Sequence, residues 1–335
     1  MNNEYSPVVP ENVITPKLFK IAIIAALAAL CIFAMFSSFI SEEVISRSGA
    51  DLVALQTAKP VTEAPAILVA VIGFAIGCYG TIVGIGGGPL IIPFLVFFYG
   101  WENELLVATS LFIVFLNAFS GCVGYAQQKR IDYKGAVKFA LAALPGAVLS
   151  GFIHHLVNVQ SFNVIFGIFL ICLAGYTLTS IKKIDAVDTV KNSAGSGKKA
   201  GWRHFKITDA FGYRFSFYSN DMLGIKLNLI LGFFCGFLGV GGGVFQVPIL
   251  IFLLKYPTHL ATATSQLVTL LTCAFALIPH VFLGNVCYAE AAWMGVGVVL
   301  GAQVGARLAA KLDSKITMYL FVIILLAFAV KLFFI

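Results

Sequence analysis

The sequence has little charge, and it lacks the patterns by which metal proteins and many enzymes are recognised. Only 11% of its 335 residues are charged and 60% are apolar, whereas soluble domains average about 25% charged residues. The seven cysteines include no Cys-x-x-Cys pair, and no histidine stands at metal-ligand spacing. We therefore expect no zinc site, disulfide framework or cofactor. No aspartate or glutamate lies well inside an apolar segment, so a proton relay through a buried carboxylate has little support.

Long apolar runs make up most of the chain. Leu18–Ile40, Leu141–Val157 and Ser161–Ile181 approach or exceed the roughly 18–20 residues that span a bilayer as a helix. The in–out alternation typical of a membrane β-barrel is absent from these runs. The sequence therefore predicts an all-α polytopic membrane protein.

A glycine-rich stretch occurs twice. Gly84–Pro93 reads GIGGGPLIIP and Gly239–Pro248 reads GVGGGVFQVP, a displacement of 155 residues from position 84 to position 239. The same displacement maps Ala108-Thr109-Ser110 onto Ala263-Thr264-Ser265. A constant offset without gaps indicates an internal duplication.

The duplication and the loop composition divide the chain into four parts. Residues 65–181 and 224–335 are expected to be two inverted-topology repeats. Each would hold a glycine-broken re-entrant or discontinuous helix pair and three transmembrane helices. Residues 1–64 would form a tail, one extra N-terminal helix and an external loop, and residues 182–223 a basic cytoplasmic linker with a flexible Ser193–Gly197 piece. The alternative for the first apolar run is a signal peptide, although no clear cleavage site follows it.

The lysine and arginine bias orients these segments. Lys129–Lys138, Lys182–Arg214 and Arg307–Lys315 are basic links and should be cytoplasmic, whereas the acidic Trp101–Glu104 should be external. Counting crossings from these links puts the N-terminus in the cytoplasm and the C-terminus outside, in a multi-pass protein of the inner or plasma membrane. The basic central stretch should attract anionic lipid, and we expect no nucleic-acid partner.

Consecutive glycines interrupt a helix and allow close approach to the backbone. Pro89 suits the first turn of the returning helix, and such a helix points unpaired N–H groups at whatever precedes it. Two inverted repeats would bring two such ends together on a small anion near the bilayer middle. The alternative is that the glycines serve only close helix packing. A nucleotide P-loop is excluded, because no Gly-Lys-Ser/Thr follows.

The candidate substrate-binding residues are those of the glycine stretches and the hydroxyl-rich segments after them: Gly86, Gly87, Gly88, Pro89, Thr109, Ser110, Gly241, Gly242, Gly243, Val244, Gln246, Thr264, Ser265 and Gln266. Pro93 and Pro248 are the expected hinge positions within the half-helices. Asn117 and Thr272 could complete a polar cavity. The alternative for the hydroxyls is that they bond to carbonyls of their own helix.

The two G-x-GGG-(x)4-P motifs, each followed by Ala-Thr-Ser, and the later Gly301–Arg307 (GAQVGAR) resemble the TauE/SafE sulfite-exporter family. The resemblance covers Ala66–Ile181 and Gly224–Phe334, and leaves the N-terminal helix and the central loop outside. It implies a secondary transporter, often an exporter, of sulfite, sulfonates or related anions. Val244 replaces Pro89 in the second copy, so the two half-sites need not be equivalent.

Two other functions stay open at this point. A passive anion channel or uniporter fits the lack of a buried carboxylate. A membrane enzyme or assembly factor that handles sulfur would need a reactive cysteine, and only Cys287 lies near an end loop. The sequence also leaves a homo-oligomer possible.

Overall fold

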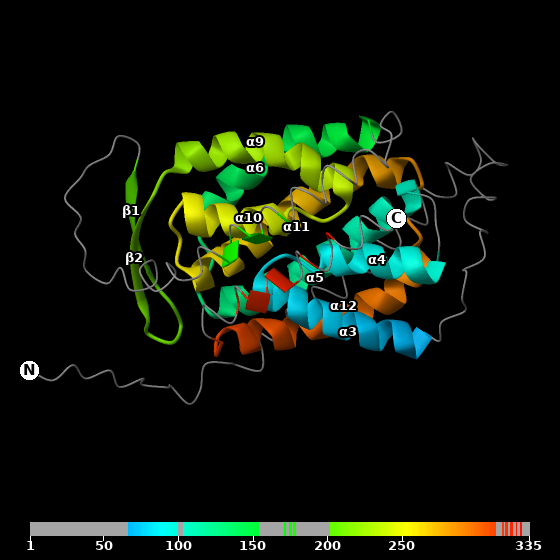
Figure 1. The fold of residues 1–335 in the computed structure, drawn as a ribbon, viewed down its shortest axis with the longest axis horizontal. Coiled ribbons are helices and arrows are strands. Elements are labelled where there is room, and N and C mark those ends of the chain that lie inside the picture. The colour runs from blue at the N-terminus through cyan, green and yellow to red at the C-terminus, as the bar shows by residue number, and fades with distance from the viewer. Residues whose placement is uncertain are drawn as a thin grey trace, which may run out of the picture.

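The computed structural model describes residues 66–99, 103–153 and 202–312, with single positions between 171 and 178 and between 317 and 329. Within these residues the chain is mostly helical (Figure 1). The expected N-terminal helix, the loop up to residue 64 and the Ser193–Gly197 piece lie outside the described residues. So does most of the last helix expected in each repeat.

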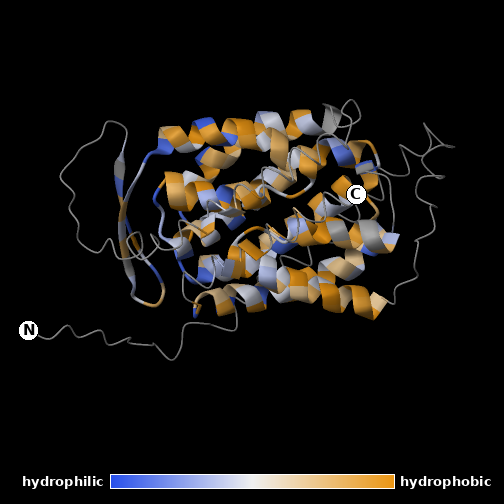
Figure 2. Cartoon of the chain, in the orientation of Figure 1, coloured by the Kyte–Doolittle hydropathy of each residue, from blue (hydrophilic) through white to orange (hydrophobic). Residues whose placement is uncertain are grey.

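The helices match the apolar runs of the sequence. They are α3 (Ala66–Val83), α4 (Gly88–Tyr99), α5 (Asn103–Gln127), α6 (Tyr133–Ile153), α9 (Asp221–Leu238), α10 (Gly243–Pro248), the π-helical turn η2 (Ile249–Leu253), α11 (Thr258–Phe282) and α12 (Tyr288–Ala309). Of these, α3, α5, α9, α11 and α12 are long and apolar enough to cross a membrane, and apolar residues dominate the helices in Figure 2. The chain is a polytopic membrane protein.

The helix boundaries repeat with the sequence. A shift of 155 residues carries both ends of α3 onto those of α9, both ends of α5 onto those of α11, and the start of α4 onto that of α10. Each glycine stretch is the break between two helices, as the motif predicted. The duplication in the sequence is therefore also a duplication of structure.

The equivalent helices α5 and α11 run antiparallel. The N–H of Cys287, just before α12, donates a hydrogen bond to the Thr109 hydroxyl near the start of α5. The N–H of Asp132, just after α5, donates a hydrogen bond to the Thr264 hydroxyl near the start of α11. The start of each helix thus lies beside the end of the other.

The fourth described helix of each repeat packs into the other repeat. α12 makes its most extensive contacts with α3 and α5, and α6 makes its own with α9 and α11. Glycines allow the backbones to touch: a Cβ on Gly301 would lie 2.1 Å from the Phe74 carbonyl oxygen, and one on Gly232 would lie 1.9 Å from that of Ala143. The repeats interlock and cannot separate as independent domains.

The prediction of an all-α fold is wrong in the central segment. β1 (Arg203–Thr208) and β2 (Arg214–Ser219) form an antiparallel hairpin. Apolar residues alternate with polar ones in both strands, so that Phe205 pairs with Phe217 and Ile207 with Phe215. Phe217 is buried against Tyr256, at a ring-centroid distance of 4.6 Å. This packing of one strand face stabilises strands in a segment whose basic composition indicated a linker.

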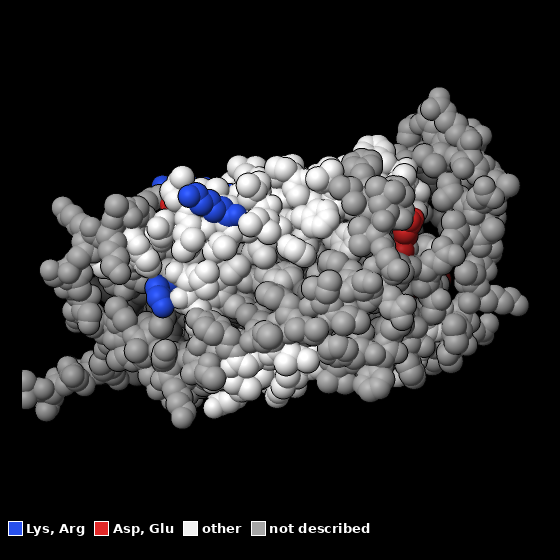
Figure 3. Space-filling view, turned by 45° about the horizontal axis from the view of Figure 1, so that its top comes forward, with Lys and Arg blue, Asp and Glu red and all other residues white. Residues whose placement is uncertain are grey.

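The hairpin marks one end of the bundle. This hairpin end comprises β1, β2, the α5–α6 link (128–132) and the η2–α11 link (254–257). The far end comprises the start of α5 and the α11–α12 link (283–287). On the face shown in Figure 3, the lysine and arginine side chains lie toward the hairpin end, and the largest acidic patch lies at the opposite end. The described surface between them is uncharged, as a membrane-facing band must be.

Candidate functional site

Both glycine loops have the same left-handed backbone. In the first loop Gly84, Gly86 and Gly87 have φ of 84°, 73° and 80°. The equivalent positions of the second loop, Gly239, Gly241 and Gly242, have φ of 67°, 77° and 83°. An L-residue with a side chain pays roughly 1–2 kcal/mol to adopt this conformation. The loop shape therefore requires glycine at these positions.

The two loops meet head to head. A Cβ on Gly88, the first residue of α4, would lie 2.3 Å from the Val240 carbonyl oxygen. A Cβ on Gly243, the first residue of α10, would lie 2.4 Å from the Ile85 Cα. These two contacts are equivalent under the repeat, so a pseudo-two-fold axis passes between the loops. The starts of two short helices lie side by side around that axis.

The two helix starts differ in their free N–H groups. In α4 the first helical bonds run from Leu90 and Ile91 to the Gly87 carbonyl, and Pro89 has no N–H. In α10 the first bonds run from Phe245 and Gln246 to the Gly242 carbonyl. Val244, where the first repeat has Pro89, therefore adds one backbone donor. The second half-site offers more hydrogen-bonding capacity than the first.

The expected hinge prolines differ as well. Pro93 lies inside α4, whereas Pro248 ends α10 and is followed by the π-helical turn η2. The Leu254 N–H bonds to the Ile249 carbonyl, five residues back, as in a π-helix. Only the second half-helix thus has an irregular turn after its proline.

The threonines of the two Ala-Thr-Ser segments bind the opposite repeat. The Thr109 hydroxyl accepts a hydrogen bond from the Cys287 N–H at 3.1 Å, and Thr264 accepts one from the Asp132 N–H, also at 3.1 Å. Cys287 and Asp132 are equivalent residues that precede α12 and α6. Each threonine therefore holds the start of the other repeat's fourth helix, where N–H groups lack helical partners.

The serines fasten the opposite glycine loop. The Ser110 hydroxyl donates to the Gly239 carbonyl at 2.9 Å, and that of Ser265 donates to the Gly84 carbonyl at 2.5 Å. Both also lie 2.9 Å from a carbonyl of their own helix. A hydroxyl has only one proton to donate, so neither serine has one left for an anion here. We call the four side chains of Thr109, Ser110, Thr264 and Ser265 the hydroxyl clasp.

Beside the loops lie buried polar atoms without a hydrogen-bond partner among the described residues. They are Asn117 Nδ2, Gln246 Nε2, Gln266 Oε1 and Nε2, and Thr269 Oγ1. The four residues are at most 2% exposed. A buried donor or acceptor left unpaired costs about 1–3 kcal/mol, so these atoms point to a ligand or ordered water at this place.

Three of these residues share one neighbourhood. The Thr269 methyl group would lie 3.1 Å from a Cβ on Gly86 and 3.3 Å from one on Gly241, so Thr269 stands between the two loops. The Thr81 hydroxyl lies 3.3 Å from Asn117 Oδ1. A Cβ on Gly121 would lie 3.3 Å from the Thr81 hydroxyl and 3.4 Å from the Gln266 Cδ. Asn117, Gln266 and Thr269 thus lie on facing surfaces of α5 and α11.

Thr81 and Thr269 were not predicted from the sequence motifs. Their equivalents are Gly236 and Val114, so neither is part of a repeated pattern. Thr272, which was expected to complete the cavity, instead donates to the Val268 carbonyl of its own helix at 2.8 Å.

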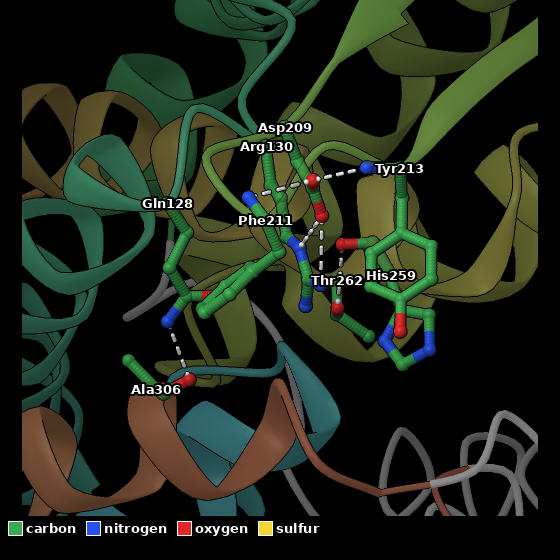
Figure 4. Close-up of polar contacts among 8 residues, drawn as sticks. All are labelled: Gln128, Arg130, Asp209, Phe211, Tyr213, His259, Thr262 and Ala306. Carbon is green, nitrogen blue, oxygen red and sulfur yellow. Dashed lines mark hydrogen bonds and ion pairs between the residues drawn. The ribbon is translucent and has the colours of Figure 1, made fainter. Parts of the chain in front are cut away.

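The hairpin end is closed by a buried ion pair (Figure 4). Asp209, in the β1–β2 turn, accepts from Nε and Nη2 of Arg130 at 3.0 and 2.9 Å, and their side chains are 0% and 3% exposed. The Ala210 N–H donates to the Gln128 carbonyl, and the Arg130 guanidinium lies over the Phe211 ring. The hairpin is therefore attached to the α5–α6 link by charge, backbone and ring contacts.

A second contact joins the two links of the hairpin end. The Tyr256 hydroxyl donates to Asp132 Oδ2 at 2.8 Å. Burial and the neighbouring Asp132 carboxylate raise the pKa of Tyr256 well above its usual value, so its hydroxyl stays a neutral donor. This bond ties the η2–α11 link to the α5–α6 link beneath the hairpin.

These features define a class: a polytopic membrane protein with interlocked helical repeats and a polar, helix-broken centre. The sequence profile of the sulfite exporter TauE/SafE family matches residues 9–127 and 103–332. The chain belongs to that family, and it is a transporter and not an enzyme. The match includes residues 9–65 and the central segment, which the motif resemblance had wrongly left outside.

Relatives agree with this assignment. The chain is 27% identical to the probable membrane transporter protein YunE of Bacillus subtilis, over 79% of this chain and 96% of the relative. It is 30% identical to a probable membrane transporter protein of Methanocaldococcus jannaschii, over 64% of this chain and 71% of the relative. No solved structure matches it.

Proposed function

We propose that the protein is a secondary transporter that exports sulfite, sulfonates or related small anions, which bind between the two glycine loops. The observation that carries the proposal is the head-to-head meeting of two left-handed loops beside buried, unpartnered donors. Backbone N–H groups at helix starts suit an anion, and neutral amides can replace part of its hydration.

The hydroxyl clasp has a positioning role in this proposal. Its four side chains were expected to contact the substrate directly. Their hydrogen bonds to the opposite repeat support a different role, in which they fix the loops and helix starts that do contact it. The direct contacts then fall to the N–H groups of Gly88, Gly243 and Val244 and to the unpartnered side chains.

We further propose that the repeats are inserted with inverted topology and that the hairpin end faces the cytoplasm. The antiparallel course of α5 and α11 and the basic side chains at the hairpin end support this orientation. The N-terminus would then be cytoplasmic and the C-terminus external. Alternating access would move the interlocked bundles about the loops.

The test is flux of radiolabelled sulfite and ethanesulfonate in proteoliposomes. Gly87→Val and Gly242→Val place a β-branched side chain at φ near 80°, and we expect both to insert normally and to lose transport. Gly175→Val is the matched control, because a Cβ there meets nothing within 4 Å. Normal flux through both loop variants would refute the proposal.

A uniporter or passive channel is the second candidate. The unpartnered side chains around the loops are amides and a hydroxyl, which do not titrate near neutral pH. Accumulation of the anion against its own gradient, driven by a proton or sodium gradient, would exclude this candidate.

A further inference from the structure

We propose that Asn117, Gln266 and Thr269 form a one-sided polar subsite that binds a hydroxyl group on the substrate anion. The inference rests on the proposed function, since it concerns the same loops. We call these three side chains the amide subsite.

The amide subsite has no counterpart across the pseudo-two-fold axis. The equivalents of Gln266 and Thr269 are Leu111 and Val114. The equivalent of Asn117 is Thr272, whose hydroxyl is already bonded to its own helix. The loops and the hydroxyl clasp repeat in both halves, but the unpartnered atoms of this cluster do not. An ion with identical oxygens on both sides would gain these extra hydrogen bonds on one side only. The asymmetry therefore indicates a ligand with two chemically different ends.

The free donors and acceptors of the amide subsite indicate the chemistry of the ligand's second end, the one that is not the anionic group. Asn117 Oδ1 accepts from the Thr81 hydroxyl, and the Asn117 NH₂ group has no partner among the described residues. Gln266 offers both Nε2 and Oε1, and neither has a partner among the described residues. An anion that carries only oxygen acceptors, such as sulfite, can satisfy the two NH₂ groups but leaves Oε1 unpaired. A ligand that also donates a hydrogen bond satisfies all of them.

A hydroxyl fits this place better than an ammonium group. The polar members of the cluster are two amides and two threonines, and no carboxylate is among them. A buried ammonium without a nearby carboxylate is costly, whereas a neutral hydroxyl needs only an acceptor such as Gln266 Oε1. The class of ligand is therefore a small hydroxy-substituted sulfonate or carboxylate. Its anionic end would face the glycine loops, and its hydroxyl would face Gln266.

The experiment compares two anions of equal charge and size, 2-hydroxyethanesulfonate and propanesulfonate, by calorimetry on the purified full-length protein. We expect the hydroxy compound to bind about tenfold more tightly, since propanesulfonate has no hydroxyl and leaves Gln266 Oε1 unpaired. Gln266→Met keeps the length of the side chain and removes both polar atoms. We expect it to abolish the preference, because neither sulfonate then meets a polar atom of the side chain at position 266.

Leu267→Met is the control, because it introduces the same side chain at the next position of α11, and it should keep the preference. Equal affinities of the wild-type protein for the two sulfonates would overturn the inference without any variant. So would a preference that survives in Gln266→Met. In either case transport of sulfonates would leave the proposed function standing. If the wild-type protein neither binds nor moves sulfite or either sulfonate, the proposed function itself fails.

Discussion

Removing one hydroxyl from the clasp separates a structural from a substrate-binding role. Ser110→Ala deletes the donor to the Gly239 carbonyl, and Ser265→Ala deletes the donor to the Gly84 carbonyl. Both serines are 0% exposed, so water cannot easily replace the hydroxyl. The two substitutions are equivalent under the repeat, and each serves as a control for the other.

The magnitude follows from the hydrogen bonds that are lost. A buried carbonyl that loses its partner costs about 1–3 kcal/mol of stability. We therefore expect each serine variant to be destabilised by about that amount in the ligand-free protein. The two variants should be destabilised by similar amounts, because the geometries are similar. If the two sites are independent, the destabilisation of the double variant should equal the sum of the two single destabilisations.

Thermal unfolding in detergent, with and without sulfite, is the assay. A clasp predicts a lower midpoint without ligand and a ligand-induced rise that is still present, since ligand binding to the folded state adds stability. A direct substrate contact predicts the reverse: an unchanged midpoint without ligand and a ligand-induced rise that is lost. The second result would refute our assignment of the serines.

Three further outcomes are expected. Asp209→Ala leaves Arg130 buried without its counter-charge, at a cost of about 3–5 kcal/mol. Limited proteolysis should therefore cut the hairpin faster, whereas Thr208→Ala at an exposed position of β1 should not change the rate. Gly297→Ala places a Cβ 2.0 Å from the Ala70 carbonyl oxygen and should loosen the α3–α12 contact, seen as faster hydrogen exchange in both helices. Burial, with a smaller effect of the Glu290 carboxylate, raises the pKa of the Cys287 thiol to about 11. Because the neutral thiol prevails below that pKa, maleimide labelling of a variant with only this cysteine should be slow at pH 7 and faster toward pH 11; rapid labelling at pH 7 would contradict this.

The sequence predicted the helix breaks and the equivalence of the repeats because both follow from glycine and from a constant offset. Gly86 and Gly241 are recognisable without a structure, since few other residues tolerate a left-handed loop. The packing of α6 and α12 into the opposite repeats could not be predicted in the same way. Small residues such as Gly301 indicate a close helix contact but do not name the partner helix.

The hairpin was missed for a different reason. The alternation of Phe205 and Ile207 with polar neighbours extends over only a few residues, inside a segment rich in lysine and arginine. Burial against Tyr256 and the Arg130–Asp209 pair stabilise these strands, and both partners are distant in sequence. Such long-range contacts cannot be inferred from the local pattern.

The residues that repeat and the residues that do not repeat have different tasks. Thr109 and Ser110 have equivalents of the same type in the second repeat, and their hydroxyls hold the opposite repeat in place. A duplicated frame requires such contacts twice, so comparison of the repeats finds them readily. Asn117 and Gln266 have no polar equivalent with free atoms, and they are the side chains that a ligand would satisfy. The repeated residues therefore form the frame of the site, and the side chains that would select its substrate lie outside the repeated pattern.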